Sequence, residues 1–280
     1  MLYHQIGKEL FREHIRFLKS NHKIISLDEL YENIKANDVP AGTVVITFDD
    51  GYKSNHTEVL PVVKEFKIPV TIYLVTNVVG TTSEFWFSKL KNIRNKIKRE
   101  KLSVDIPSRE FFLKCSDTEK TDKINELAKK VNYKPAQREA LSWGEINEMH
   151  DTGYIHFGAH THTHPALTNI DDKQVKKELK LSKRILEKKL NNKVNHFSYP
   201  NGNYYEKHLK LIKKAGYLTA TTTNAGVNTT KTNPYLLYRI GIGETNSIPV
   251  TAVKISGLWY KIRKLDFDWD NYGRKDNPVN

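Results

Sequence analysis

The stretch TVVITFDDGY (43–52) decides the fold of this 280-residue chain. Its first six residues form a short β-branched apolar run, which is typical of a strand buried on both faces of a sheet. Asp49 and Asp50 follow directly, and Gly51 permits a sharp turn after them. Two adjacent carboxylates behind a buried strand are costly unless they bind a cation or share a proton. An ordinary Asp-Asp-Gly turn is the alternative interpretation of the same residues.

Strands and helices alternate on both sides of this stretch. Besides residues 43–48, the apolar runs predict strands over 70–75, 154–160, 196–200, 217–223 and 236–242. Helical spacing predicts helices over 8–20, 27–35, 58–66, 142–153, 171–190 and 204–215, with Ser142 as a candidate N-cap. Repeated strand-then-helix units predict an α/β fold with a parallel sheet inside and helices outside. Six or seven strands with chemistry at their carboxyl ends favour a barrel over an open sheet.

Residues 84–140 interrupt this alternation with aromatic, basic and helical stretches. We interpret them as a helical insertion packed beside the main domain. The sequence has no internal repeat and no low-complexity linker. We therefore expect one domain over 1–280 that carries this insertion.

The composition supports a packed core, because 38% of the residues are hydrophobic and 28% are charged. The net charge of +13 raises nucleic acid, an anionic membrane surface or an acidic glycan as partners. The basic residues are spread along helical segments such as 88–101 and 173–189, which indicates a solvated surface rather than a nucleic-acid site. The single Cys115 excludes an intrachain disulfide and a cysteine-based zinc cluster. A metal would have to be held by histidine and carboxylate.

No apolar stretch approaches the roughly 18 residues that a transmembrane helix needs. The opening MLYHQIGKEL (1–10) also lacks the apolar core of a secretory signal. As written, the chain is expected in the cytoplasm, or at the cell envelope if a leader was removed. The basic and aromatic tail, residues 257–275, is a candidate for peripheral contact with a membrane surface that holds lipid-linked glycans.

The second chemical signal is GAHTHTHPAL (158–167), which contains His160, His162 and His164. Alternate residues of a strand share a face, so the three imidazoles can converge, and Pro165 disfavours a helix at this point. Imidazole suits zinc and its neighbours in the first transition row. One carboxylate and two histidines would form a three-ligand catalytic metal site, which leaves the second carboxylate free as a base. A packed or solvated histidine cluster is the alternative, and His4 is a further candidate to line the same pocket.

Three motifs together resemble the polysaccharide deacetylases, the carbohydrate esterase family four. They are TFDDGY (47–52), HTHTHP (160–165) and SYPNG (198–202), and the resemblance extends from LYH (2–4) to RIGI (239–242). It implies a distorted (β/α)7 barrel and a divalent metal, usually zinc, with cobalt or nickel as alternatives. The implied function is a metal-dependent hydrolase that removes acetyl groups from N-acetylated sugars of a polysaccharide or glycan precursor.

The resemblance also implies roles for individual residues. Asp49 would be the general base, and Asp50, His160 and His164 the metal ligands, with His162 as a flanking residue. The backbone N–H of Asn201 would stabilise the oxyanion of the tetrahedral intermediate.

Two positions depart from the family pattern. Ser198 stands where the third motif commonly begins with an arginine, and Arg239 is a candidate to supply that charge from a neighbouring strand. The usual late histidine, the presumed acid, is absent because no histidine follows His208. These departures keep a non-catalytic glycan-binding relative open as an alternative function. An amidohydrolase-type barrel is a weaker one, because its histidine pair belongs to the first strand.

Aromatic residues are candidates for stacking on sugar rings. Tyr199 and Pro200, inside the third motif, are expected to bind substrate together with Trp143. Trp86 is a further candidate of the same kind. For both tryptophans, a seam between packed elements is the alternative location.

Overall fold

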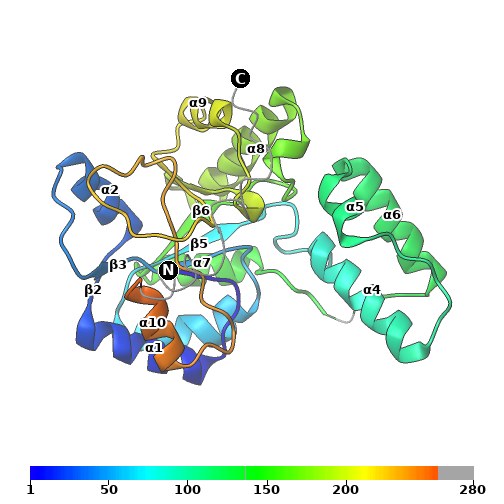
Figure 1. Cartoon of the computed structure of the whole chain (residues 1–280), viewed down its shortest axis with the longest axis horizontal. Coiled ribbons are helices and arrows are strands. Elements are labelled where there is room, and N and C mark those ends of the chain that lie inside the picture. Colours follow the sequence, from blue (N-terminus) through cyan, green and yellow to red (C-terminus); the bar gives the residue numbers. More distant parts are fainter. Residues whose placement is uncertain (136, 258–280) are drawn as a thin grey trace.

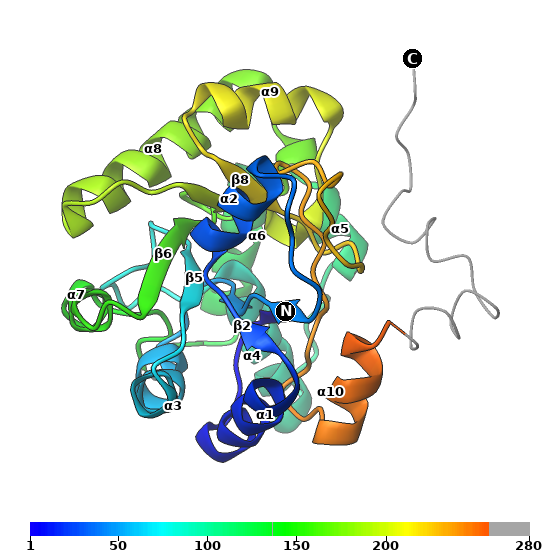
Figure 2. The same ribbon diagram turned by 90° about the vertical axis from the view of Figure 1, so that its left-hand side faces the viewer.

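Six parallel strands form the main sheet in the computed structural model, which describes residues 1–135 and 137–257. Each strand pairs in parallel with its neighbours, and the sheet curls into a half-barrel with helices on its outside (Figure 2). In spatial order the strands are β1 (Leu2–Tyr3), β4 (Thr47–Phe48), β5 (Val70–Leu74), β6 (Ile155–Ala159), β7 (His196–Ser198) and β8 (Thr219–Thr221). The expected (β/α) barrel-type fold is confirmed.

The helices around the sheet are amphipathic, and most of them turn their apolar residues toward one shared core. The helix over Leu27–Lys35 is the exception, because its Leu27 and Leu30 belong to a smaller cluster with Tyr73 and Leu237. Ser142 caps the helix Trp143–Asp151 through a capping box with Glu145, and Asp171 caps the helix Asp172–Leu190 by accepting the backbone N–H of Gln174. The helices are α1 (Lys8–Asn21), α2 (Leu27–Lys35), α3 (Leu60–Phe66), α7 (Trp143–Asp151), α8 (Asp172–Leu190), α9 (Glu206–Lys214) and α10 (Ile248–Ile255). Single turns of other helix types are η1 (Asn55–Val59), η2 (Leu167–Asn169) and η3 (Pro200–Gly202).

The apolar run 43–48 is not one strand, which corrects the sequence-based expectation. Its first part, β3 (Thr43–Val44), pairs with β2 (Lys23–Ile24) in a separate two-stranded sheet. Its second part, β4, pairs with β1 and β5 in the main sheet. The chain crosses from one sheet to the other at residues 45–46, so a single apolar run serves two sheets.

The segment 236–242, expected as a strand, lies between β8 and β1 and has only isolated bridges. Leu237 bridges to Thr221 of β8, and Gly241 bridges to Leu2 of β1. The N–H of Leu2 donates to the carbonyl of Ile240, 2.9 Å away. The segment therefore occupies the position of a seventh strand without forming a regular one among the described residues.

Three helices between β5 and α7 pack around an apolar core of their own. They are α4 (Trp86–Glu100), α5 (Arg109–Lys114) and α6 (Asp117–Lys130), and Figure 1 shows them as a group beside the sheet. Their core consists of Leu90, Ile93, Ile97, Phe112, Ile124, Leu127, Ala128 and Val131. The aromatic and basic stretch that follows β5 is thus helical.

No helix in the described residues combines the length and the apolar character that crossing a membrane requires. The basic and aromatic tail proposed for membrane contact lies outside the described residues except for Gly257.

Candidate metal centre and active site

The turn after β4 directs two carboxylates into one cavity. Asp50 has a φ of +71° and Gly51 a φ of +79°, so the chain reverses immediately after the strand. A Cβ atom at Gly51 would lie 2.3 Å from Cδ2 of Leu74, which explains why this position takes glycine. Asp49 and Asp50 are both buried and both line the same cavity.

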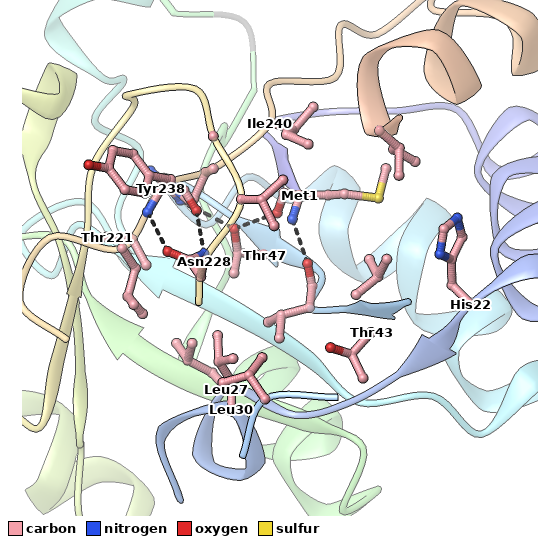
Figure 3. A pocket seen from close by; sticks show the side chains of 18 of the residues that line it. Met1, His22, Leu27, Leu30, Thr43, Thr47, Thr221, Asn228, Tyr238 and Ile240 are labelled. Atoms are coloured by element: carbon pink, nitrogen blue, oxygen red, sulfur yellow. Dashed lines mark hydrogen bonds between the residues drawn. The ribbon is translucent and has the colours of Figure 1, made fainter. Parts of the chain in front are cut away.

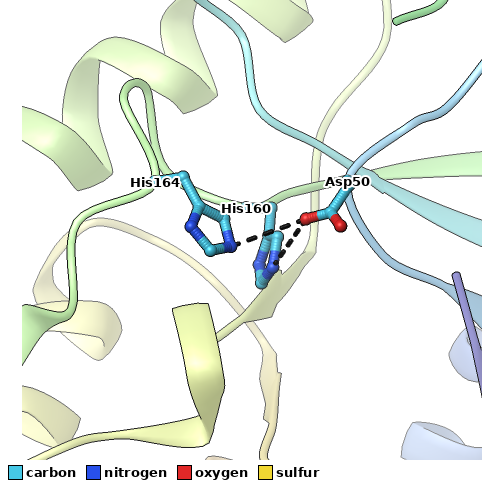
Figure 4. A group of neighbouring side chains, drawn as sticks. All are labelled: Asp50, His160 and His164. Carbon is cyan, nitrogen blue, oxygen red and sulfur yellow. Dashed lines mark ion pairs between the residues drawn. The ribbon is translucent and has the colours of Figure 1, made fainter. Parts of the chain in front are cut away.

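The end of β6 brings two imidazoles to Asp50 (Figure 4). Nε2 of His160 lies 3.6 Å and Nε2 of His164 lies 3.5 Å from Oδ1 of Asp50. The loop reaches this geometry through left-handed backbone at Thr161 and His164. His162 does not line the cavity, and its Nδ1 lies 2.9 Å from Oγ1 of Thr76.

A hydrogen bond fixes the tautomer of His160. Its Nδ1–H donates to the carbonyl of Ser198, 2.8 Å away. Nε2 therefore carries no proton in the neutral ring and presents its lone pair toward Asp50. The same arrangement orients histidine ligands in many metal sites.

The three side chains suit a divalent transition metal. One ligand atom from each of Asp50, His160 and His164 lies within 4.8 Å of the others, and all three residues are buried. Oδ1 of Asp50 has no hydrogen-bond partner in the described part of the chain, although it is buried. Two imidazole nitrogens and one carboxylate oxygen are a donor set for zinc and its neighbours, with further coordination positions left open.

The pKa shifts of these three residues also favour a bound divalent cation. Burial, and then the charge of Asp49, raise the pKa of Asp50 well above its usual value. Burial lowers the pKa of His160 to about 4, and burial together with His160 lowers the pKa of His164. Without a cation the cluster is thus driven toward its uncharged forms, and a bound divalent cation would favour an ionised Asp50 beside neutral imidazoles.

Asp49 is held by a different partner. Arg239, from the segment 236–242, donates from two nitrogens to its two carboxylate oxygens, at 2.7 Å each. The hydroxyl of Ser198 donates to Oδ2 of Asp49 at 3.3 Å. Burial by itself would raise the pKa of Asp49, but the Arg239 guanidinium and His160 hold it well below its usual value. Asp49 is therefore a charged carboxylate next to the candidate metal ligands.

The cavity over this centre has a volume of about 460 Å³. The main sheet and its loops contribute His4, Asp49, Asp50, Tyr52, His160, His164, Asn201 and Thr223. Helices α4 and α5 contribute Trp86, Phe87, Leu90, Lys91, Arg94, Asn95 and Phe112. From the sequence, His4 was a candidate to line this cavity and Trp86 a candidate to stack on a sugar ring. The sequence did not predict that Phe87, Lys91 and Arg94 line it. The spacing of these three residues along the sequence indicates that they share one face of a helix. It does not show which face of that helix turns toward the sheet.

Three expected substrate-binding residues do not line this cavity. Tyr199 is fully buried, and its hydroxyl donates to the carbonyl of Tyr235. Pro200 is buried beside it at the start of η3. Trp143 packs against the main core, and the ammonium of Lys189 lies 5.4 Å from its ring.

A second cavity of about 270 Å³ lies between α2 and the segments that close the sheet (Figure 3). Its lining includes Leu27, Leu30, Thr43, Thr221, Asn228 and Ile240. Arg239 borders this cavity and also contacts Asp49. The candidate metal ligands lie in the first cavity and not in this one.

Comparisons with known proteins agree on one family. The family model described as polysaccharide deacetylase matches residues 36–220. A poly-beta-1,6-N-acetyl-D-glucosamine N-deacetylase of Staphylococcus aureus is 24% identical over 250 residues, covering 86% of this chain and 69% of the relative.

Solved structures share the fold. The Streptococcus pyogenes deacetylase PplD, solved in complex with acetate, has a TM-score of 0.65 and 20% identity, covering 91% of this chain and 96% of that one. IcaB from Ammonifex degensii has a TM-score of 0.65 and 18% identity, with coverages of 90% and 94%.

Replacing one candidate ligand should weaken metal binding strongly. After chelation and dialysis against Zn²⁺, we expect the wild type to retain about one equivalent. Asp50→Asn and His164→Gln should bind zinc more weakly by over about 100-fold, because even outer-shell changes cost up to that factor. Elemental analysis gives the bound metal, and a zinc-dependent rise in Tm gives a second readout. His56→Gln is the control, because this partly exposed histidine pairs with Glu148 away from the cavity. Retention of wild-type zinc by Asp50→Asn would contradict the assignment.

Proposed function

We propose, from the premise that this chain belongs to the polysaccharide deacetylase family, that it is a metal-dependent hydrolase. It removes acetyl groups from N-acetylated sugars of a polysaccharide or glycan precursor. The observation that carries this proposal is a buried Asp-His-His group next to a second carboxylate that Arg239 keeps charged. The similarity to an N-acetylglucosamine polymer deacetylase supports the same class of substrate.

Asp50, His160 and His164 would hold the cation, which we propose to be zinc, with cobalt or nickel as alternatives. When bound, such an ion polarises the acetyl carbonyl and lowers the pKa of water. Asp49 accepts the proton of the attacking water, because its carboxylate is ionised and adjacent to the three ligands. Arg239 and Ser198 hold Asp49 in place through hydrogen bonds to its oxygens.

The departing amine needs a proton, and His4 is our candidate donor. It follows β1, and its exposed side chain lines the cavity together with Asp49 and His160. Asn201 lines the same cavity, and we assign its backbone N–H to the oxyanion.

The alternative, a non-catalytic glycan-binding relative, rested on two unfilled positions in the sequence pattern. Arg239 contacts Asp49 although Ser198 replaces the usual arginine. His4 lines the cavity although no late histidine exists. Both observations favour the hydrolase over the binding module.

The deciding experiment is acetate release. With zinc or cobalt, the purified protein should release acetate from N-acetylglucosamine oligomers, and Asp49→Asn should lower kcat by about 100-fold or more while metal stays bound. Acetate is measured by a coupled enzymatic assay, and zinc content by elemental analysis. If the wild type releases no acetate from a broad set of N-acetylated glycans, the binding-module function is correct instead.

His4→Gln tests the proton donor. For an N-acetylglucosamine trimer, kcat should fall by about 100-fold or more, because the amine leaves poorly without a proton. For p-nitrophenyl acetate, whose leaving group needs no proton, kcat should change by less than about tenfold. His56→Gln serves as the matched control. An equal loss on both substrates would assign His4 to binding or folding rather than to proton donation.

Arg239→Met should shift the pH dependence of kcat/KM. Arg239 lowers the pKa of Asp49, so the wild-type base stays ionised, and active on this account, down to low pH. Without the guanidinium the pKa of Asp49 rises, and the acid limb of the profile should move to higher pH. Arg239→Lys should move the acid limb by less than Arg239→Met does, and Ser198→Ala should move it least of the three. Because the methionine variant buries an unpaired charge and is expected to lose about 3–5 kcal/mol of stability, circular dichroism must confirm folding at the assay temperature. If the acid limb of the folded variant lies at the same pH as that of the wild type, the ion pair between Arg239 and Asp49 does not set the pKa of the base.

A further inference from the structure

One face of α4 lines the metal cavity. Phe87, Leu90, Lys91, Arg94 and Asn95 are all part of the lining. Their spacing of three, four, seven and eight residues places them on a single helix face. Leu90 also belongs to the core that α4 shares with α5 and α6, so the same packing fixes this face in position.

The helix starts at the candidate metal ligands and leads away from them. The ring of Phe87 lies 5.3 Å from the ring of His164, centroid to centroid. Lys91 is four residues further along and Arg94 is seven, which corresponds to about 6 Å and about 10 Å of helix rise. Both cations therefore lie in the same cavity as the candidate metal ligands, one and two turns along α4 from the contact of Phe87 with His164.

Positive charge is in excess along this lining. The two acidic residues in it are Asp49, which Arg239 neutralises, and Asp50, which belongs to the candidate metal ligands. Lys91 is exposed and forms no ion pair with the described residues. Glu139 lies outside this lining, and one of its carboxylate oxygens already accepts the backbone N–H of Phe85 at 3.0 Å.

Arg94 is anchored at a fixed position. One terminal nitrogen donates to the carbonyl of Pro107 at 3.0 Å, and the guanidinium lies 5.9 Å from the ring centroid of Phe112. A guanidinium has five N–H donors, so this contact leaves others available to a ligand. Lys91 adds a mobile ammonium on the adjacent turn. Together the guanidinium of Arg94 and the ammonium of Lys91 suit a carboxylate or a phosphate, because both cations bind such anions through charge-assisted hydrogen bonds.

We propose that the substrate carries an anionic group, a carboxylate or a phosphate, bonded next to its N-acetylated sugar, either on the adjoining sugar or at the anomeric carbon, and that Lys91 and Arg94 bind this group. The inference rests on the proposed deacetylase function and specifies its substrate class. Two sources share this chemistry: a uronate within a polymer, and a glycosyl phosphate of a precursor.

The test compares three probes that share the same acetamido sugar. They are a neutral N-acetylglucosamine trimer, a tetrasaccharide of alternating N-acetylglucosamine and glucuronate, and N-acetylglucosamine 1-phosphate. For the zinc-loaded protein, kcat/KM for acetate release and Kd by calorimetry are measured separately. Lys91→Glu is the test variant, because Arg94 also holds the Pro107 carbonyl. Lys98→Glu is the matched control, because this exposed lysine lies on the same helix but not in the cavity lining.

Lys91→Glu should lower kcat/KM for at least one anionic probe by about tenfold or more, and change it for the neutral trimer by less than about twofold. The preference of the wild type for that probe should shrink between about 50 mM and about 500 mM NaCl. The probe that responds identifies the carboxylate or the phosphate as the source.

Equal effects on all probes, or a wild-type preference for the neutral trimer, overturn the inference while the deacetylase function stands. If no probe releases acetate, the proposed function fails, and the Kd values decide: Lys91-dependent binding of an anionic probe supports the inference, and equal Kd values overturn it.

Discussion

The buried ion pair between Arg239 and Asp49 is the interaction on which the rest of this structure depends. A carboxylate in a protein interior is costly unless its partner is well oriented and every polar atom is satisfied. Here the guanidinium contacts both oxygens of Asp49, and its Nε donates to the carbonyl of Thr222 at 2.8 Å. It also donates to the hydroxyl of Ser198 at 3.0 Å. The pair thus joins the residue after β4 to the last residue of β7 and the first residue after β8, and it anchors the irregular segment that lies between β8 and β1.

The second constraint is the direction of the strands. Because β4 and β6 are parallel to β5, the residues after Phe48 and after Ala159 emerge at the same edge of the sheet. Left-handed backbone at Asp50 and His164 then turns the side chains toward each other. Asp49 and Asp50 come from consecutive positions but meet opposite environments. One faces a fixed guanidinium, and the other faces two neutral imidazoles that leave room for a cation.

Helices α4 and α5, which share an apolar core with α6, give the cavity its far wall. Their own apolar core holds α4 rigidly, so the face that carries Phe87, Lys91 and Arg94 is presented to the candidate metal centre in a fixed orientation. A site built in this way separates two tasks physically. The sheet edge supplies the groups that would act on the acetyl group, and α4 supplies Phe87, Lys91 and Arg94 to the lining of the same cavity.

The sequence by itself determined the alternation of strands and helices, the two aspartates behind a buried apolar run, and the histidine triplet. These are local patterns, because a strand period, a glycine turn and a proline are written in neighbouring residues. It did not determine that residues 43–48 serve two sheets, that Tyr199 belongs to the core and Trp143 packs against it, or that α4 turns Lys91 toward the cavity. Each of these depends on which distant segment lies alongside. The contact of Arg239 with Asp49, 190 residues apart, was only a candidate in the sequence. It became definite when the segment 236–242 took its place beside β1, because only tertiary packing sets the distance between charges so far apart in the chain.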